Sequence, residues 1–286
     1  MSVAQPAGFT QRVAGGDGLV FMGAPAGGGG SLSFDFTSGL LPPEITFTRS
    51  TTGTYFTIGG ILTVAAINAA RFNYVGGVAC LLVEPAATNL LTFSNAFLSG
   101  GWSVENAAVL TAAQFTSPDG TNNGWNDTSG TGFGQAVQQI TVGAGPHTCS
   151  AWIKQIAGGG SGWLAIGNQF SAALPITATI ARKSYTGTPG AGSQKFGVNG
   201  GNPAGVTLGL FGCQVEAGPV ATSYIPTGAS AVTRAADSAT FTIPAGVTQL
   251  TFTFDDNSTQ LVSVSPGSYT IPVTLNRANI KTIIGT

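Results

Sequence analysis

The sequence predicts an all-β protein organised as a jelly-roll β-sandwich. Short segments alternate apolar and polar residues with a period of two, as in residues 45–50 and 176–180, and this is the pattern of half-buried strands. Turns rich in Gly, Pro and Asn separate these segments, and no convincing helical stripe extends over three turns. Many short strands joined in this way are typical of sandwiches and jelly rolls.

The first thirty residues differ from the rest of the chain. Two glycine clusters, at residues 15–18 and 27–30, flank a short apolar patch at residues 19–22. Such a stretch cannot form its own core. We predict that residues 1–30 form an anchor or linker that docks on a larger assembly, and a loose terminal tail is the alternative.

The predicted strands follow from residue 31 onward. Residues 148–154 place Cys149, Ala151 and Ile153 on one face of a strand. In residues 208–215 the apolar phase slips, which indicates a β-bulge near residues 209–212. Residues 64–72 are the best helix candidate, but they have no clear cap and soon reach two glycines.

A boundary is predicted near residues 233–237. The chain after it contains two or three strand-like segments, and a three-stranded unit of that size is marginal alone. We therefore expect it to pack on the main sandwich or on symmetry mates. The predicted organisation is an anchor at residues 1–30, a jelly roll at 31–235 and a small C-terminal β unit at 236–286 that makes oligomer contacts.

The composition favours a folded, self-associating protein. Only 7% of the residues are charged and 43 are glycine, against about 25% charged residues in an ordinary domain. A surface poor in Lys and Glu is weakly protected against association, so we expect an oligomer. The net charge of −1 and the lack of basic residues between Arg71 and Lys154 predict no nucleic-acid partner. No apolar run is long enough to cross a bilayer and no export signal begins the chain, so we expect no membrane insertion and synthesis in the cytoplasm.

The sequence offers little for catalysis or cofactor binding. Cys80, Cys149 and Cys213 lack metal-ligand spacing and are predicted to be buried thiols, although Cys149 and Cys213 could touch on neighbouring strands. The single histidine, His147, belongs to no nucleophile motif. Nothing selects a pair of carboxylates for glycoside hydrolysis. We predict no catalytic residues, no cofactor and no metal; a calcium ion near Asp119 and Asp127 is a weaker alternative.

Two segments contain the residues that sugar recognition requires, which are an aromatic face and nearby amides or carboxylates. One lies at residues 117–127 and provides Trp125, Asn126 and Asp127 together with Asn122. The other provides Trp163, followed by an amide pair at residues 168–169. We take these five residues as the candidate glycan site, with ordinary loop chemistry as the alternative.

Two longer motifs carry a family resemblance. The first comprises FTRS at residues 47–50, RFNY at 71–74 and LLVEPAATNLL at 81–91; the second comprises CQVEAGPVATSYIPT at 213–227 and VTRAAD at 232–237. Together with SAWIK at 150–154, they resemble phage and prophage fibre or minor structural proteins that carry a carbohydrate-binding-module-like, concanavalin-like jelly roll. The resemblance covers roughly residues 34 to 237.

The resemblance implies a virion protein without enzymatic activity. It implies a homotrimeric tail or head fibre, or a spike, that docks on other virion proteins through residues 1–30 and attaches the particle to a host surface polysaccharide. The alternative is a purely architectural capsid decoration or tail adaptor subunit that binds no sugar.

The matched segments contain acids and arginines that could form ion pairs. Glu84 and Glu216 follow apolar strands, and Arg49, Arg71 and Arg234 are three of six arginines. We predict that these acids and arginines pair and pin the sandwich ends together. The alternative is a set of charges at the rim worth less than about 1 kcal/mol each.

Overall fold

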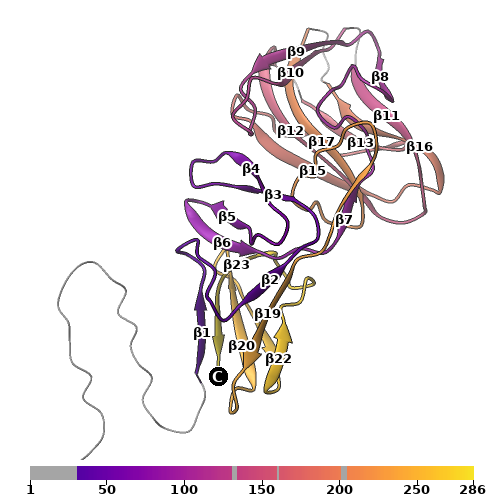
Figure 1. The fold of residues 1–286 in the computed structure, drawn as a ribbon. Helices are drawn as coiled ribbons and strands as arrows, with labels where there is room; N and C mark the ends of the chain where they lie inside the picture. Colours follow the sequence, from indigo (N-terminus) through magenta and orange to yellow (C-terminus); the bar gives the residue numbers. More distant parts are fainter. Residues whose placement is uncertain (1–30, 131–133, 160, 201–204) are drawn as a thin grey trace, which may run out of the picture.

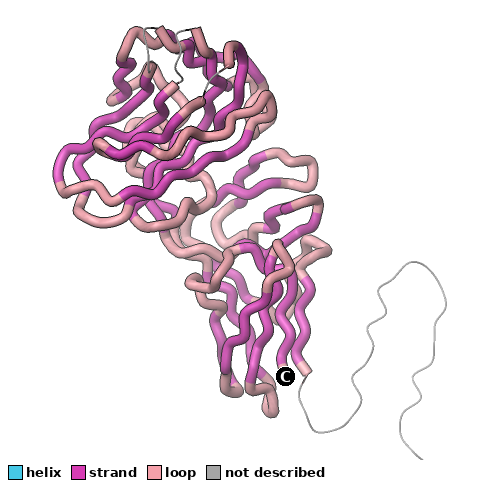
Figure 2. Tube along the Cα trace, turned by 180° about the vertical axis from the view of Figure 1, so that it is seen from behind, coloured by secondary structure: helices cyan, strands magenta, loops and turns pink. Residues whose placement is uncertain are grey.

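A computed structural model describes residues 31–130, 134–159, 161–200 and 205–286 (Figure 1). Throughout these ranges the chain forms strands and turns and no helix (Figure 2). The all-β prediction is therefore confirmed. The helix candidate at residues 64–72 instead ends one strand, turns at Asn68 with a positive φ of 60°, and begins the next. The predicted anchor, residues 1–30, lies outside the described residues.

The upper part of the molecule in Figure 1 is a sandwich of two five-stranded antiparallel sheets. We call it the upper sandwich. One sheet consists, in order, of β15 (Ala181–Gly187), β12 (His147–Ala157), β17 (Thr207–Ala217), β10 (Gly124–Thr128) and β9 (Val109–Phe115). The other consists of β14 (Gln169–Phe170), β13 (Trp163–Ile166), β16 (Gly192–Asn199), β11 (Gln135–Val142) and β8 (Trp102–Glu105).

From β10 to β17 the chain passes back and forth between these two sheets. This double-sheet arrangement is that of a jelly roll, so the predicted fold class is confirmed. Cys149, Ala151 and Ile153 lie in the core between the sheets, as their alternation predicts. The predicted bulge is also present, because the pairing of β12 with β17 shifts register opposite Gly212, whose φ is 57°.

The lower part of the molecule is a second, smaller sandwich, which we call the lower sandwich. Its apolar core is shared by two sheets, and Phe34 of one sheet meets Phe241 of the other edge to face at 4.9 Å. The larger sheet contains β21 (Thr259–Ser263), β20 (Gln249–Phe254), β23 (Asn279–Gly285), β6 (Val78–Leu82) and β5 (Phe72–Val75), with β1 (Leu32–Asp35) on β23. The smaller sheet contains β2 (Thr46–Thr48), β19 (Ser238–Ile243) and β22 (Gly267–Thr270).

The structure divides the chain differently from the expected boundary at residue 235. Strands β1 and β6 pair with β23, and β2 pairs with β19, so residues before 90 complete the C-terminal unit. The physical reason is that the C-terminal strands alone could not bury side chains such as Phe252 and Phe254, which are fully buried here. The upper sandwich is thus an insertion into the lower one.

Two small elements lie between the sandwiches (Figure 1). One is the hairpin of β3 (Gly53–Phe56) and β4 (Leu62–Ala65), and the other is the ribbon of β7 (Ala87–Asn89) with β18 (Val232–Arg234). Together with the segment that follows β17, they form the junction between the two sandwiches.

Candidate functional site at the junction

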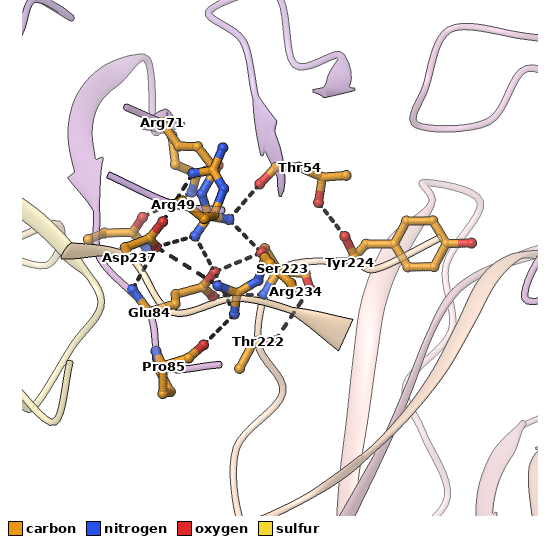
Figure 3. A network of polar contacts seen from close by, with 12 residues as sticks. Arg49, Thr54, Arg71, Glu84, Pro85, Thr222, Ser223, Tyr224, Arg234 and Asp237 are labelled. Carbon is orange, nitrogen blue, oxygen red and sulfur yellow. Dashed lines mark hydrogen bonds and ion pairs between the residues drawn. The ribbon is translucent and has the colours of Figure 1, made fainter. Parts of the chain in front are cut away.

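Five charged side chains meet inside the junction (Figure 3), and all of them come from the two motif segments. Turns and strand ends position them, at the points where the chain passes between sandwiches. The three arginine side chains and that of Asp237 are at most 1% exposed, and that of Glu84 is 7% exposed. The cluster comprises Arg49, Arg71, Glu84, Arg234 and Asp237.

The two acids bridge the three arginines. Arg49 Nη1 lies 3.0 Å from Asp237 Oδ1, and Arg71 Nη2 contacts both Asp237 Oδ2 and, at 2.8 Å, Glu84 Oε2. Arg234 Nη2 lies 3.4 Å from Glu84 Oε2 and donates to the Pro85 carbonyl at 2.8 Å. Charge-assisted hydrogen bonds of this kind satisfy charges that burial would otherwise penalise.

The cluster also holds the segment that leaves the upper sandwich. The Ser223 backbone N–H and Oγ–H both donate to Glu84 at 2.7 Å, and Arg71 Nη1 donates to Ser223 Oγ and to the Thr54 carbonyl. Gly53 lies against the arginines, because a Cβ there would lie 3.2–3.3 Å from three of their side chains. A larger residue at this position would push the arginines apart.

The predicted pairing of acids with arginines is confirmed for Glu84 and not for Glu216. Glu216 is buried but accepts hydrogen bonds from Thr222 instead. The second acid of the cluster is Asp237, which was not among the predicted partners and pairs with Arg49 and Arg71. Burial works to raise the pKa of Glu84, but Arg71, Arg234 and Ser223 together hold that pKa below its usual value.

An aromatic cluster adjoins the charges on the outer face of the upper sandwich. Trp152 meets Tyr224 edge to face at 5.4 Å and Phe56 at 6.2 Å, so the β3–β4 hairpin covers this sheet. The Arg182 guanidinium stacks 4.8 Å from the Trp152 ring centroid. The Tyr224 hydroxyl shares a 2.6 Å hydrogen bond with Ser94 Oγ, which ties the cluster to the sandwich.

Between the aromatic cluster and the charges lies a cavity of about 220 Å³, which we call the junction cavity. Both sandwiches and the hairpin contribute to its walls. Interfaces between structural units are common places for ligand sites. Its side chains combine apolar, amide and charged groups; they include Phe56, Asn73, Glu84, Trp152, Arg182 and Asn279.

The predicted glycan residues do not converge on one site. Trp125 is half-buried on β10, packs edge to face on Phe97 at 5.9 Å and donates from Nε1 to the Asn95 carbonyl at 3.0 Å. Asp127 is fully buried on the same strand, with no hydrogen-bond partner in the described chain, and burial raises its pKa to about 7. Asn126, between them, is half-buried.

The other two predicted residues lie apart from these. Asn122 is exposed and donates to the Ala113 carbonyl at 3.1 Å, whereas Trp163 is half-buried at the start of β13 in the other sheet. The loop at residues 117–123 supports the β3–β4 hairpin, because the Leu62 N–H donates to the Pro118 carbonyl at 2.8 Å. Within the loop, the polar side chains of Ser117, Thr121 and Asn123 all donate hydrogen bonds to Asp119, which explains the polar composition without a sugar.

Replacing Trp125 with alanine is expected to destabilise the upper sandwich by roughly 2–4 kcal/mol, since the indole packs against the core and a cavity would remain. Thermal unfolding of the variant measures this. Wild-type stability combined with loss of polysaccharide binding would instead assign Trp125 to a sugar site.

The single histidine and the three cysteines are all buried in the fold. His147 is buried at the start of β12, with Nδ1 3.0 Å from the Gly145 carbonyl oxygen. All three cysteines are buried and unbridged. Cys149 and Cys213 touch, which the sequence left open, and their hydrogen bond together with burial holds the pKa of Cys149 well above its usual value.

The described ranges contain neither a metal-binding cluster nor a membrane-spanning helix. No three His, Cys, Asp or Glu side chains gather there in a group that could hold a metal ion. Nor do these ranges contain a helix with the length and apolarity needed to cross a bilayer.

Comparison with known proteins gives similar structures but no related sequence. No family model and no curated protein sequence matches the chain. The CBM22-1 xylan-binding domain of Paenibacillus barcinonensis Xyn10C is similar at 13% identity and a TM-score of 0.36, over 48% of this chain and 99% of that one. The CBM22-1–CBM22-2 tandem of the same protein gives 12% and 0.37, over 72% of this chain and 92% of that one.

A domain of tailspike protein 4 from bacteriophage CBA120, described as enzymatically active, gives 11% identity and a TM-score of 0.34. That similarity covers 44% of this chain and 21% of the tailspike chain. At these identities and TM-scores, none of the similarities assigns a family to this protein.

Proposed function

We propose that the protein is a non-enzymatic fibre or spike subunit of a virion that presents its upper sandwich to a glycan on the host cell surface. The observation that carries the proposal is the arrangement of the chain. Leu32 pairs with Gly285 on the lower sandwich, so the described chain enters and leaves there, and the upper sandwich lies at the far end (Figure 1).

The buried ionic junction supports this role. Five buried charges, linked to both sandwiches, set the orientation of one sandwich on the other, and a fixed orientation is what a subunit that extends from a particle needs. The sequence motifs that resemble phage fibre proteins are the segments that supply these charges. The proposed subunit docks on the particle through residues 1–30 and associates as a trimer.

The alternative function is a purely architectural decoration or adaptor subunit. The position of the predicted glycan residues favours it, because Trp125 packs on the core and the 117–123 loop supports the hairpin. Both functions are compatible with the buried ionic junction, and sugar binding distinguishes them.

The test is binding of the purified full chain to bacterial host cells with and without their surface polysaccharide, together with a sugar-release assay. We expect binding that depends on the polysaccharide and releases no sugar. Absence of binding by a folded oligomer would favour the architectural subunit, and release of sugar would contradict the non-enzymatic proposal.

A further inference from the structure

The junction cavity has the chemistry of a sugar site. Phe56 and Trp152 supply apolar walls, and Asn73 and Asn279 supply amides. Sugar rings need this combination of an aromatic surface with groups that hydrogen-bond their hydroxyls. At about 220 Å³ the cavity is smaller than the roughly 300–1,000 Å³ of drug-sized ligand sites, so its size suits a single sugar residue rather than a longer chain.

Several N–H groups at the cavity remain available to donate hydrogen bonds to a ligand. A guanidinium carries five N–H groups, and Arg182 uses two in the described structure, to the Thr222 carbonyl at 2.6 Å and to Ser150 Oγ at 2.9 Å. Its Nε–H is buried and has no partner there. The Asn279 carbonyl oxygen accepts from Asn73 at 3.1 Å, while its NH₂ group donates to no described residue.

The charge around the cavity favours an anionic group. Among the residues that line it, the charged ones are Arg182 and Glu84, and the carboxylate of Glu84 is paired with Arg71 and Arg234. The Glu84 oxygens already accept hydrogen bonds from Ser223 and Arg71. The hydrogen-bonding groups that remain for a ligand are therefore donors.

We propose that the junction cavity binds one carboxylate-bearing sugar residue, such as a uronic acid, of the host surface polysaccharide. The Arg182 guanidinium faces the carboxylate of the sugar. Phe56 contacts the sugar ring, and the Asn279 amide contacts its hydroxyls. This inference rests on the proposed function, because it names the place and class of the glycan.

The test uses the full chain with D-glucuronic acid as the probe and D-glucose as its neutral counterpart, measured by NMR titration. We expect at least tenfold tighter binding of glucuronic acid. Ala221→Trp fills the cavity from its wall and should abolish this binding, whereas Val220→Trp, at a neighbouring residue that is 68% exposed and not part of the wall, should leave it unchanged.

Because a bulky residue can perturb folding, Asn279→Asp is the second variant. It keeps the oxygen that accepts from Asn73 and adds a negative charge, so glucuronic acid should bind at least tenfold more weakly while the melting temperature changes little. Equal affinity for both sugars, or unchanged binding by Ala221→Trp and Asn279→Asp, would overturn the inference.

The same variants in the host-cell assay separate this inference from the proposed function. If wild type and Ala221→Trp bind the polysaccharide equally, the proposed function stands and the cavity is not its site. If glucuronic acid binds in the cavity but no host polysaccharide is bound, the proposed function fails and the cavity site is retained.

Discussion

Replacing Asp237 with asparagine is expected to lower the free energy of unfolding by about 3–5 kcal/mol, because removing one partner from a buried ionic network leaves uncompensated charge. Asp237 contacts both Arg49 and Arg71, and its side chain is fully buried. The neutral amide would leave three buried arginines around the single carboxylate of Glu84. The measurement is urea unfolding followed by far-UV circular dichroism.

Glu105→Gln is the matched control. Glu105 pairs with Lys195 at 2.7 Å, but the two side chains are 32% and 48% exposed, so the loss should be below about 1 kcal/mol. All four tryptophans lie between residues 102 and 163, in the upper sandwich. Tryptophan fluorescence therefore shows whether Asp237→Asn separates the unfolding of the two sandwiches. Equal losses in the two variants would contradict a structural role for the cluster.

Local sequence patterns predicted the features that depend on neighbouring residues. Alternation in residues 148–154 placed Cys149 and Ile153 in the core, and the phase slip predicted a bulge near residues 209–212, where the pairing of β12 with β17 does shift register. The motif acids and arginines were expected to pair, and Glu84 does so. Each of these follows from strand periodicity or from the scarcity of charges.

Long-range pairing could not be predicted in the same way. Nothing local in residues 32–35 indicates that they pair with residues 282–285, so the boundary predicted near residues 233–237 separates strands that pair with one another. The glycan candidates were chosen by composition, which does not reveal that Trp125 faces Phe97. The junction cavity could not be predicted because its walls come from segments that lie more than 200 residues apart in the sequence.

Because Asp127 is a buried acid, we expect the stability of the protein to depend on pH in an unusual way. Asp127 is fully buried on β10, lies opposite Leu110 and Leu208 on the neighbouring strands, and has no hydrogen-bond partner in the described chain. Burial raises its pKa to about 7, whereas in the unfolded chain the pKa is about 3.9. Below both values the group is protonated in both states and contributes no pH dependence.

As the pH rises from 4 to 7, the unfolded chain releases this proton and the folded chain retains it, so folding is progressively disfavoured. Above pH 7 the loss levels off at on the order of 4 kcal/mol, since one pKa unit corresponds to about 1.4 kcal/mol. Asp127→Asn removes this titration. The stability of the variant relative to wild type should therefore rise between pH 4 and 8, measured by urea unfolding at each pH.

Asp119→Asn is the control, because the pKa of Asp119 is shifted in the opposite direction from that of Asp127. Burial works to raise the pKa of Asp119, but hydrogen bonds from Ser117, Thr121 and Asn123 hold it below its usual value. Its carboxylate therefore stabilises the fold above about pH 4, and its replacement should cost stability at neutral pH. Because each comparison takes the difference from wild type, titration of other groups such as Glu84 cancels. A flat profile for Asp127→Asn would mean that its carboxylate is solvated or paired in solution.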